Sequence, residues 1–510
     1  MESQPEFYEA TLIRKQGLLK NRVVIVFNAS AITIRNCNGE KDQSELHIVR
    51  ERIICANHPE EFNCLLNCSE YVNLQFLELK LNRKHSWTGL NGRFYLRKKT
   101  LRLMFKNHKA ANQFTETAYS ILVSPCSETE KPYLIFANPF SGSGRAAKIL
   151  KRRVLPMFNR LRIPYAIIFT NSRGHAEEWV EKCTGAELAQ YRAIVLVSGD
   201  GLVYEVLNGL AKRSDGLRIP LGLIPAGGGN ATAAAVCYFS GLCPTMDPVL
   251  QSTFILCQPT CLTQSRAPND EHLLVNNSRF VQHSDPVDSI YFETLNGDCV
   301  RCGILSVVWG ELGQMDVRSE LFRWLGNTRL LVSGLISLFW HRSYEATVSF
   351  LSYQSKSNEM CESASNSNCY QRLYLPSPDQ PIPETWTSIE GKFYTIFAIT
   401  HSHIAHDTIL FPNSTLDNGY MNLVMIDSST TIFSRLQLMQ LMFSNNELPQ
   451  RSYMKIVPVV AFRVEPKYPD CSVTLVDGDL VSRGTFQCEL HQNEFQLLTC
   501  SKNKISRQSM

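Results

Sequence analysis

A carboxylate between two glycines is the residue of this chain best placed to do chemistry. Asp200 stands in the segment Ser198-Gly199-Asp200-Gly201, directly after the apolar run at residues 193–197. Such a run predicts a buried strand, so the carboxylate would lie at the strand's carboxyl end, where ligands bind in open α/β sheets. There it can accept a proton from a substrate hydroxyl, as phosphoryl transfer needs. The alternative is a solvated Asp-Gly turn, and the long helix predicted after it, which carries Glu205 one turn in, argues against an isolated turn.

Two further glycine-rich segments also follow apolar runs and open predicted helices. They are NPFSGSG at residues 138–144 and PAGGGNA at residues 225–231. Backbone N–H groups in such turns, together with the positive end of a helix, form a cradle for phosphate. Three consecutive glycines cost conformational entropy, so the close approach of a ligand explains them better than a flexible hinge does. The first segment lacks the GK[ST] ending of a Walker loop and fits a GxGxxA dinucleotide pattern only loosely.

The elements that must position these loops alternate between strand and helix. Apolar runs begin at residues 133, 165, 193 and 219, and a helical pattern follows each of them. Alternation of this kind predicts a parallel sheet whose two faces are covered by helices. The three glycine loops then fall on one edge of one sheet, and together they predict a nucleotide phosphate site that contains a carboxylate.

The flanking regions are rich in predicted strands. Residues 1–125 show short strands and then a helical pattern at residues 108–123, an order typical of a pleckstrin-homology-like barrel. Residues 271–500 predict an antiparallel region, interrupted by a Ser-, Asn- and Pro-rich segment at residues 352–385 that is typical of a flexible insertion. We therefore expect an N-terminal β-rich regulatory domain at residues 1–125, an α/β catalytic domain at 131–270 and a C-terminal β domain at 271–500.

Composition excludes several other classes of protein. A chain of 510 residues predicts about three domains, and a net charge of +4 over that length is too small for general binding of nucleic acid. Seventeen scattered cysteines, an odd number, favour free thiols in a reducing cytosol, and no metal centre is predicted from them. No secretory signal and no apolar run of 18 residues is present, so we expect a cytoplasmic protein.

Four motifs taken in order resemble the diacylglycerol kinase catalytic superfamily and, more closely, the sphingosine kinases. They are SGDGLVYEVLNGL at residues 198–210, PAGGGNA at 225–231, the stretch from LSVVWG to GNTRL at 305–330, and VDGD at 476–479. The resemblance covers about residues 131–500. It departs from the family pattern at Gly228, where a serine is usual, at Asp479, where a glutamate is usual, and at Phe140, where a basic residue often stands.

The resemblance implies an ATP-dependent kinase that phosphorylates the primary hydroxyl of sphingosine or a related sphingoid base to give sphingosine 1-phosphate. A ceramide kinase or a diacylglycerol kinase is the alternative. The implied fold is an α/β nucleotide-binding domain with a C-terminal β-sandwich that binds lipid, and the site lies in the cleft between them. Asp200 would activate the hydroxyl within the substrate loop Ser198, Gly199 and Gly201, and Asp316 would hold the amine or polar head. ATP or its Mg²⁺ would be contacted by Asn138, Pro139, Phe140, Thr170, Asn171, Ser172, Arg173, Gly174, Glu205, Gly227, Gly228, Gly229, Arg323, Arg329, Asp477, Gly478 and Asp479.

Some points stay open at this level. Arg323 and Arg329 lie near opposite faces if one helix carries both, and they can converge on a nucleotide only if Gly326 ends that helix. The apolar run at residues 330–340 suits a lipid tunnel, a peripheral membrane surface or an ordinary core helix. A catalytically silent lipid-binding protein and an NADP-linked oxidoreductase are the rival classes, and the oligomeric state is left open. We expect that replacing Asp200 with Asn removes most of the rate and leaves stability nearly unchanged.

Overall fold

The computed structural model describes most of the chain, and every structural statement below concerns that part. The described residues are 6–13, 20–28, 31–36, 45–49, 53–57, 71–81, 94–122, 131–258, 280–295, 297, 299–322, 329–339, 342–354, 372–378, 380–444, 448 and 451–502.

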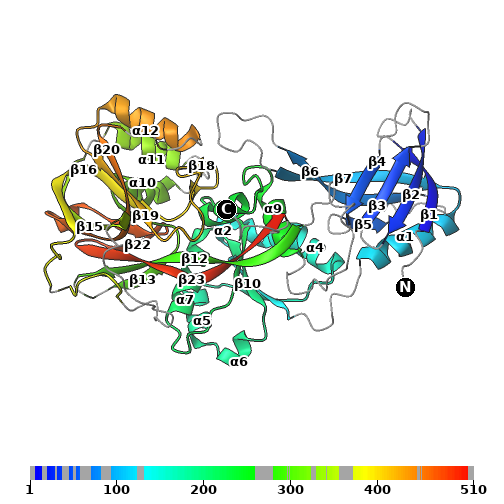
Figure 1. The fold of residues 1–510 in the computed structure, drawn as a ribbon, viewed down its shortest axis with the longest axis horizontal. Helices are drawn as coiled ribbons and strands as arrows, with labels where there is room; N and C mark the ends of the chain where they lie inside the picture. Colours follow the sequence, from blue (N-terminus) through cyan, green and yellow to red (C-terminus); the bar gives the residue numbers. More distant parts are fainter. Residues whose placement is uncertain are drawn as a thin grey trace.

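The N-terminal part is a seven-stranded antiparallel sheet followed by one helix (Figure 1). Its strand order is β4-β3-β2-β1-β7-β6-β5. The strands and the single helix agree with the pattern in the sequence, and closure into a pleckstrin-homology-like barrel stays a prediction. The elements are β1 (Glu6–Ile13), β2 (Lys20–Asn28), β3 (Ala31–Asn36), β4 (Glu45–Val49), β5 (Ile53–Asn57), β6 (Tyr71–Leu81), β7 (Phe94–Phe105) and α1 (His108–Leu122).

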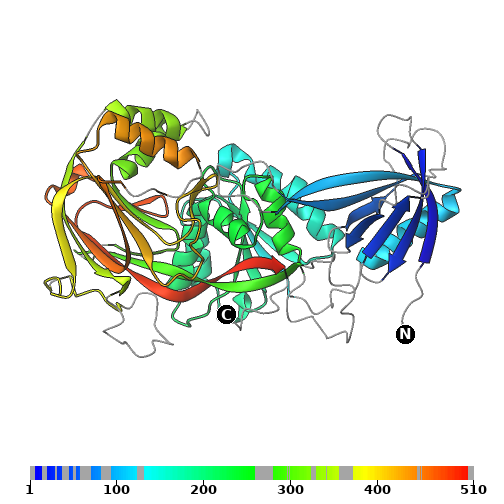
Figure 2. The ribbon, with the colours of Figure 1, turned by 45° about the horizontal axis from the view of Figure 1, so that its top comes forward.

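The paired strands β6 and β7 connect this sheet to the rest of the molecule. In both views they reach from the N-terminal sheet toward helix α9 (Pro248–Leu256) (Figures 1 and 2). Leu96 on β7 is buried in the same hydrophobic cluster as Phe254, and its N–H donates to Oε1 of Gln251 at 3.3 Å. The N-terminal sheet is therefore packed against the central part of the chain.

The central part is the parallel sheet that the alternating pattern predicts. Its strands lie in the order β11-β10-β8-β9, all parallel. Every residue of β8, β10 and β11 is buried, as expected for strands covered by helices on both faces. The elements are β8 (Tyr133–Ala137), α2 (Ser141–Gly144), α3 (Ala146–Ile149), the π-helical η3 (Leu150–Val154), α4 (Leu155–Arg160), β9 (Tyr165–Phe169), α5 (His175–Lys182), α6 (Gly185–Leu188), β10 (Ala193–Ser198), α7 (Asp200–Ala211), β11 (Leu221–Pro225), α8 (Ala231–Phe239) and α9.

The C-terminal part consists mainly of antiparallel strands with three helices at one end. Strands β15, β16, β19 and β20 pair in a closed ring, since β15 and β19 each pair with both β16 and β20. The elements are β12 (Phe280–Thr294), β13 (Val300–Gly303), β14 (Ser306–Gly310), α10 (Glu311–Ser319), α11 (Arg329–Phe339), β15 (Tyr344–Ser352), β16 (Thr387–Ile399), β17 (His403–Ala405), β18 (Thr408–Ile409), β19 (Met421–Asp427), α12 (Ile432–Ser444), β20 (Met454–Pro466), η8 (Pro469–Cys471), β21 (Thr474–Val476), β22 (Asp479–Ser482) and β23 (Phe486–Lys502).

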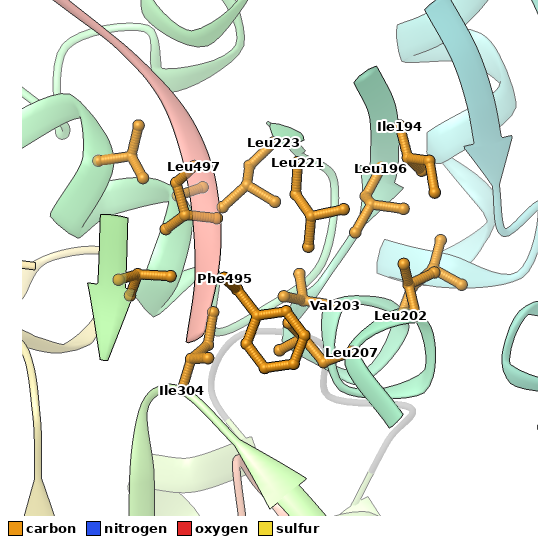
Figure 3. Packing of buried hydrophobic residues seen from close by; sticks show 14 of the residues in the cluster. Ile194, Leu196, Leu202, Val203, Leu207, Leu221, Leu223, Ile304, Phe495 and Leu497 are labelled. Atoms are coloured by element: carbon orange, nitrogen blue, oxygen red, sulfur yellow. The ribbon is translucent and has the colours of Figure 1, made fainter. Parts of the chain in front are cut away.

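The central and C-terminal parts share one sheet and one core. Strand β23 pairs in parallel with β11 at Leu221 and Leu497, and in the same sheet it runs antiparallel to the long strand β12. Figure 3 shows Phe495 and Leu497 of β23 packed with Leu221, Leu223 and the α7 side chains. The sequence suggested separate sheets before and after residue 270, whereas the chain's last strand joins them.

The segment predicted as a flexible insertion is anchored at its C-terminal end. The buried carboxylate of Glu489 accepts hydrogen bonds from the N–H groups of Leu373 at 2.7 Å, Tyr374 at 2.6 Å and Leu375 at 2.9 Å. Buried Glu293 pairs with Arg372 at 2.7 Å. Residues 355–371 of the segment lie outside the described part. Across the described helices, none is long and apolar enough to cross a membrane.

Candidate active site

The three glycine loops predicted to meet at one sheet edge are in direct contact. They follow β8, β10 and β11, which are neighbours in the sheet. The hydroxyl of Ser141 accepts a hydrogen bond from the N–H of Gly199 at 3.2 Å, and Ser198 donates to the same hydroxyl at 3.2 Å. A Cβ placed on Gly227 would lie 2.4 Å from Cα of Gly199. The first and third loops are therefore both packed against the second, which carries Asp200.

Packing between the loops, and not a ligand as expected from the sequence, explains one of the three consecutive glycines. Gly227 is needed because its backbone lies directly against that of Gly199. A Cβ on Gly228 would meet nothing within 4 Å, and one on Gly229 would lie 3.0 Å from Oδ2 of Asp200. Gly229 is therefore crowded by Asp200 itself, and Gly228 is the glycine of the three that faces open space in the described structure.

Asp200 is held by the helix that follows the third loop. Its Oδ2 accepts a hydrogen bond from the N–H of Ala231 at 3.0 Å, and its Oδ1 accepts one from the N–H of Thr232 at 3.1 Å. These are the first two residues of α8, whose own N-cap residue Asn230 makes no side-chain cap. A side chain from α7 therefore caps α8, and this fixes the carboxylate between two exposed glycines, Gly201 and Gly229.

Glu205, the second acidic residue of α7, makes the same kind of contact with α5. Its Oε2 accepts a hydrogen bond from the N–H of Ala176 at 3.4 Å, and the backbone of Gly174 also lies beside this carboxylate. Burial raises the pKa of Glu205, and these backbone groups act in the opposite direction. Helix α7 thus binds the N-terminal ends of two neighbouring helices through its own carboxylates.

The predicted nucleotide residues of the first two strands lie at the same sheet edge. Oδ1 of Asn138 accepts a hydrogen bond from the N–H of Phe140 at 3.0 Å, which fixes the turn after β8 and leaves the Phe140 ring 77% exposed. Thr170 after β9 is buried and donates its N–H to the carbonyl of Ala137 at 3.0 Å. The other residues of that turn and of the first loop are partly or fully exposed: Pro139, Asn171, Ser172, Arg173 and Gly174.

Asp477 is buried, and its carboxylate is engaged by the backbone. Oδ1 accepts from the N–H groups of Leu305 at 3.0 Å and Ser306 at 2.9 Å, and Oδ2 accepts from Ile304 at 2.8 Å. Burial raises the pKa of Asp477 to about 6 in spite of these donors. Asp477, with a positive φ of 51°, therefore holds the turn between β13 and β14 together and has little capacity left for a ligand.

Asp479 is the carboxylate of this motif that faces the glycine loops. One of its oxygens would be 3.5 Å from a Cβ placed on Gly201, and it forms an ion pair with Arg173 from the turn after β9. Burial raises the pKa of Asp479, and the guanidinium of Arg173 lowers it. Asp316 on α10 lies close to the same turn, because its Oδ2 is 3.9 Å from a Cβ position on Gly478.

Two residues that the sequence predicts for the site lie wholly or partly outside the described structure. Two residues that contact the glycine loops were not predicted. Arg323 lies outside the described residues, and Arg329 begins α11 with a side chain that is also outside them. Ser141, which joins the first two loops, is inside a predicted loop and could have been found there. His406 follows strand β17, and its N–H donates to the carbonyl of Gly229 at 2.8 Å. No local signal in the sequence connects it to that loop.

The chain is similar in sequence to several lipid kinases. Residues 132–253 match the model of the diacylglycerol kinase catalytic domain. Sphingosine kinase 1 of Rattus norvegicus is 27% identical over 76% of this chain and 94% of that protein, and the Homo sapiens protein is 28% identical over 74% and 92%. A ceramide kinase of Homo sapiens is 30% identical over 44% of this chain and 38% of that protein. A solved diacylglycerol kinase from Bacillus anthracis str. Sterne is 15% identical, with a TM-score of 0.45, and the match covers 73% of this chain and 97% of that chain.

The site and the matching domain indicate one class of protein: residues 132–253 match a diacylglycerol kinase catalytic domain, and the similar proteins support an ATP-dependent lipid kinase. Within that class, the resemblance to the sphingosine kinases seen in the sequence motifs is confirmed over about three quarters of the chain.

Proposed function

We propose that the protein is a sphingosine kinase, which transfers the γ-phosphoryl group of ATP to the primary hydroxyl of sphingosine or a related sphingoid base. The observation that carries the proposal is the position of Asp200. It lies between two exposed glycines at the end of a parallel strand, in a chain similar to sphingosine kinases over most of its length.

The geometry of Asp200 suits a base that acts on a hydroxyl. Each carboxylate oxygen accepts one backbone N–H, so each keeps acceptor capacity for a substrate proton. The N–H donors of α8 fix the orientation of the carboxylate before substrate binds, which phosphoryl transfer needs because positioning supplies much of its rate. The open space at Gly228 suits the phosphates.

The residues present also fit Mg²⁺ carried by the nucleotide. Mg²⁺ commonly binds one or two carboxylates and completes its shell with phosphates and waters. Asp479 is the carboxylate we assign to this ion, since Asp477 is engaged by three N–H groups. The bound ion would neutralise phosphate charge, and Arg173, beside Asp479, would contact the phosphates themselves.

Asp316 supports a substrate that carries a free amine. It lies next to Gly478 on the C-terminal side of the site, where a carboxylate can pair with an ammonium group. A ceramide or a diacylglycerol has no ammonium and would gain nothing from this pair. The ceramide kinase match spans only 38% of that protein, so ceramide is the weaker candidate.

We also propose that the protein works at a membrane surface, through helices α11 and α12. Ser333 and Ser337 of α11 are buried and donate to the carbonyl of Met315 at 2.6 Å and to Glu311 at 2.8 Å, whereas Leu335 and Phe339 are exposed. In α12, next to α11 in both views, Arg435 is buried while Ile432, Phe433 and Leu436 are exposed (Figures 1 and 2). Exposed apolar side chains over buried polar ones fit a lipid surface better than water.

In domain terms, we propose a regulatory N-terminal domain at residues 1–125, a nucleotide-binding domain at 131–270 and a lipid-binding β-sandwich at 271–500. The nucleotide would bind between the last two, because Arg173 and Asp479 approach the same site from each of them.

The test is transfer of labelled phosphate from Mg-ATP to sphingosine, ceramide and diacylglycerol in separate reactions. We expect label on sphingosine, lost in Asp200→Asn. The Asp316→Asn variant should lose activity on sphingosine and leave any activity on ceramide unchanged. Transfer only to ceramide or only to diacylglycerol would mean that this lipid, and not sphingosine, is the substrate. Transfer to no lipid would contradict the proposal.

Membrane binding has its own test, sedimentation with phosphatidylcholine vesicles. The double change Phe339→Ser and Phe433→Ser should weaken sedimentation, whereas Tyr468→Ser, at an exposed aromatic residue elsewhere, should not.

A further inference from the structure

Two phenylalanine rings are exposed at the ends of neighbouring strands beside the first glycine loop. Phe140 is 77% exposed and Phe169 is 51% exposed. Phe169 is the last residue of β9 and pairs in register with Ala137, the last residue of β8. Burying a phenylalanine side chain is favourable, so two exposed rings at one sheet edge forgo stabilisation that the fold could otherwise gain.

Phe169 lies toward one face of the sheet, and the turn that carries Phe140 leads into the helices that cover that face. On β9, Tyr165 and Ile167 pack into the cluster that α3, η3 and α4 cover, and Ala166 and Ile168 pack into the cluster on the other face. Phe169 continues the first series because side chains alternate along a strand. The turn that carries Phe140 leads into α2 and α3, which cover that same face.

The distance from Asp200 to the two rings matches the distance from the phosphates of a nucleotide to its base. Asp200 follows β10, and β8 and then β9 are the next strands along the sheet. Two strand spacings of about 4.8 Å place the end of β9 roughly 10 Å from the end of β10. A nucleotide with its phosphates at the glycine loops would therefore extend its base across the ends of β8 and β9.

We propose that Phe140 and Phe169 form an aromatic platform on which the base of the bound nucleotide stacks. The inference rests on the proposed function, and it names the residues that recognise the base. The Asn138 side chain holds the Phe140 backbone by a hydrogen bond at 3.0 Å, so the ring is carried on a fixed turn. Stacking on an aromatic face accepts any purine, because every base has such a face, so ATP and GTP should both use the platform.

Calorimetry with two ligands separates the contribution of the base to binding affinity from that of the phosphates. The probes are Mg-ATP and Mg-tripolyphosphate, and the proteins are the wild type, Phe140→Ala, Phe169→Ala, Phe140→Trp and the control Tyr468→Ala. We expect each alanine variant at the platform to weaken ATP binding about tenfold, from a stacking contribution of this order, and to leave tripolyphosphate binding unchanged. Phe140→Trp should keep the affinity for ATP, and Tyr468→Ala should change neither probe.

The results that would refute the aromatic platform differ from the result that would refute the proposed kinase function. An equal loss of both probes would mean that Phe140 shapes the phosphate loop, and unchanged ATP binding in both alanine variants would mean that the base lies elsewhere. A wild type that binds neither probe would refute the kinase assignment itself. Because both rings are exposed, the variants should unfold at the wild-type temperature, and Phe140→Ser provides a second version of the test.

Discussion

The carboxylate of Asp200 accepts a hydrogen bond from the N–H of Ala231 at 3.0 Å, which makes the proposed base the cap of the next helix. The second oxygen accepts from Thr232 in the same helix. One side chain therefore joins the loop after β10 to the helix after β11, and the proposed catalytic role and the structural role depend on the same two oxygens.

Replacing Asp200 with Asn should therefore lower stability as well as rate, contrary to the expectation from sequence alone. The rate should fall about 10²–10⁴-fold through loss of the base. The free energy of unfolding should fall by about 0.5–2 kcal/mol, because an amide offers one oxygen where the carboxylate offered two. Asp247→Asn is the matched control, since Asp247 caps α9 outside the site. Asp247 accepts one cap N–H, from Leu250, which an amide oxygen can also accept, so this control should keep most of its stability and all of the rate. An Asp200→Asn protein as stable as the wild type would contradict the capping role.

Gly227 and Gly228 should respond differently to the same added methyl group. Gly227→Ala places its Cβ against the backbone of Gly199, so we expect a loss of about 1–3 kcal/mol in stability and at least a tenfold loss of rate. Gly228→Ala meets open space and should be stable and folded like the wild type. Urea unfolding of both variants checks this prediction. Equal stability of the two would show that the loops do not pack as described.

The ion pair of Arg173 and Asp479 should matter for nucleotide binding and little for stability. Arg173 is largely exposed, so Arg173→Ala should change the free energy of unfolding by less than about 0.5 kcal/mol. It should raise the KM for Mg-ATP. It should also move the acidic limb of the pH–activity profile to higher pH, because the guanidinium lowers the pKa of Asp479. Asp479→Asn should raise the Mg²⁺ concentration needed for half-maximal rate, whereas an unchanged Mg²⁺ requirement would remove Asp479 from the metal site.

Because His401 is buried, we expect the folded protein to lose stability as the pH falls. Its ring is fully buried, and burial lowers its pKa from 6.5 to about 4. The unfolded chain binds a proton at higher pH than the folded chain, so the stability contribution is present above pH 6.5. It is lost as pH falls toward 4, at up to about 1.4 kcal/mol per pH unit. The difference in unfolding free energy between the wild type and His401→Gln should shrink from pH 7 to pH 4.5. A difference independent of pH would show that His401 titrates normally.

The sequence by itself determined the features that depend on neighbours along the chain. Apolar runs alternating with helical patterns gave the parallel sheet, because residue period and burial are local properties. A glycine-rich turn after each of three strands placed Asp200, the Asn138 turn and the Gly227 loop at one edge, because parallel strands end on the same side. The resemblance of four ordered motifs gave the class of enzyme.

Tertiary structure alone decided which of the predicted residues have capacity left for a ligand. Asp477 and Asp479 look equivalent in the sequence, yet one is engaged by the N–H groups of residues 304–306 and the other faces Arg173, 306 positions away. The contact of Gly227 with Gly199 and the burial of the α11 serines are likewise decided by packing. Such contacts join residues far apart in the chain, and the local pattern carries no record of what each side chain meets once the sheet has formed.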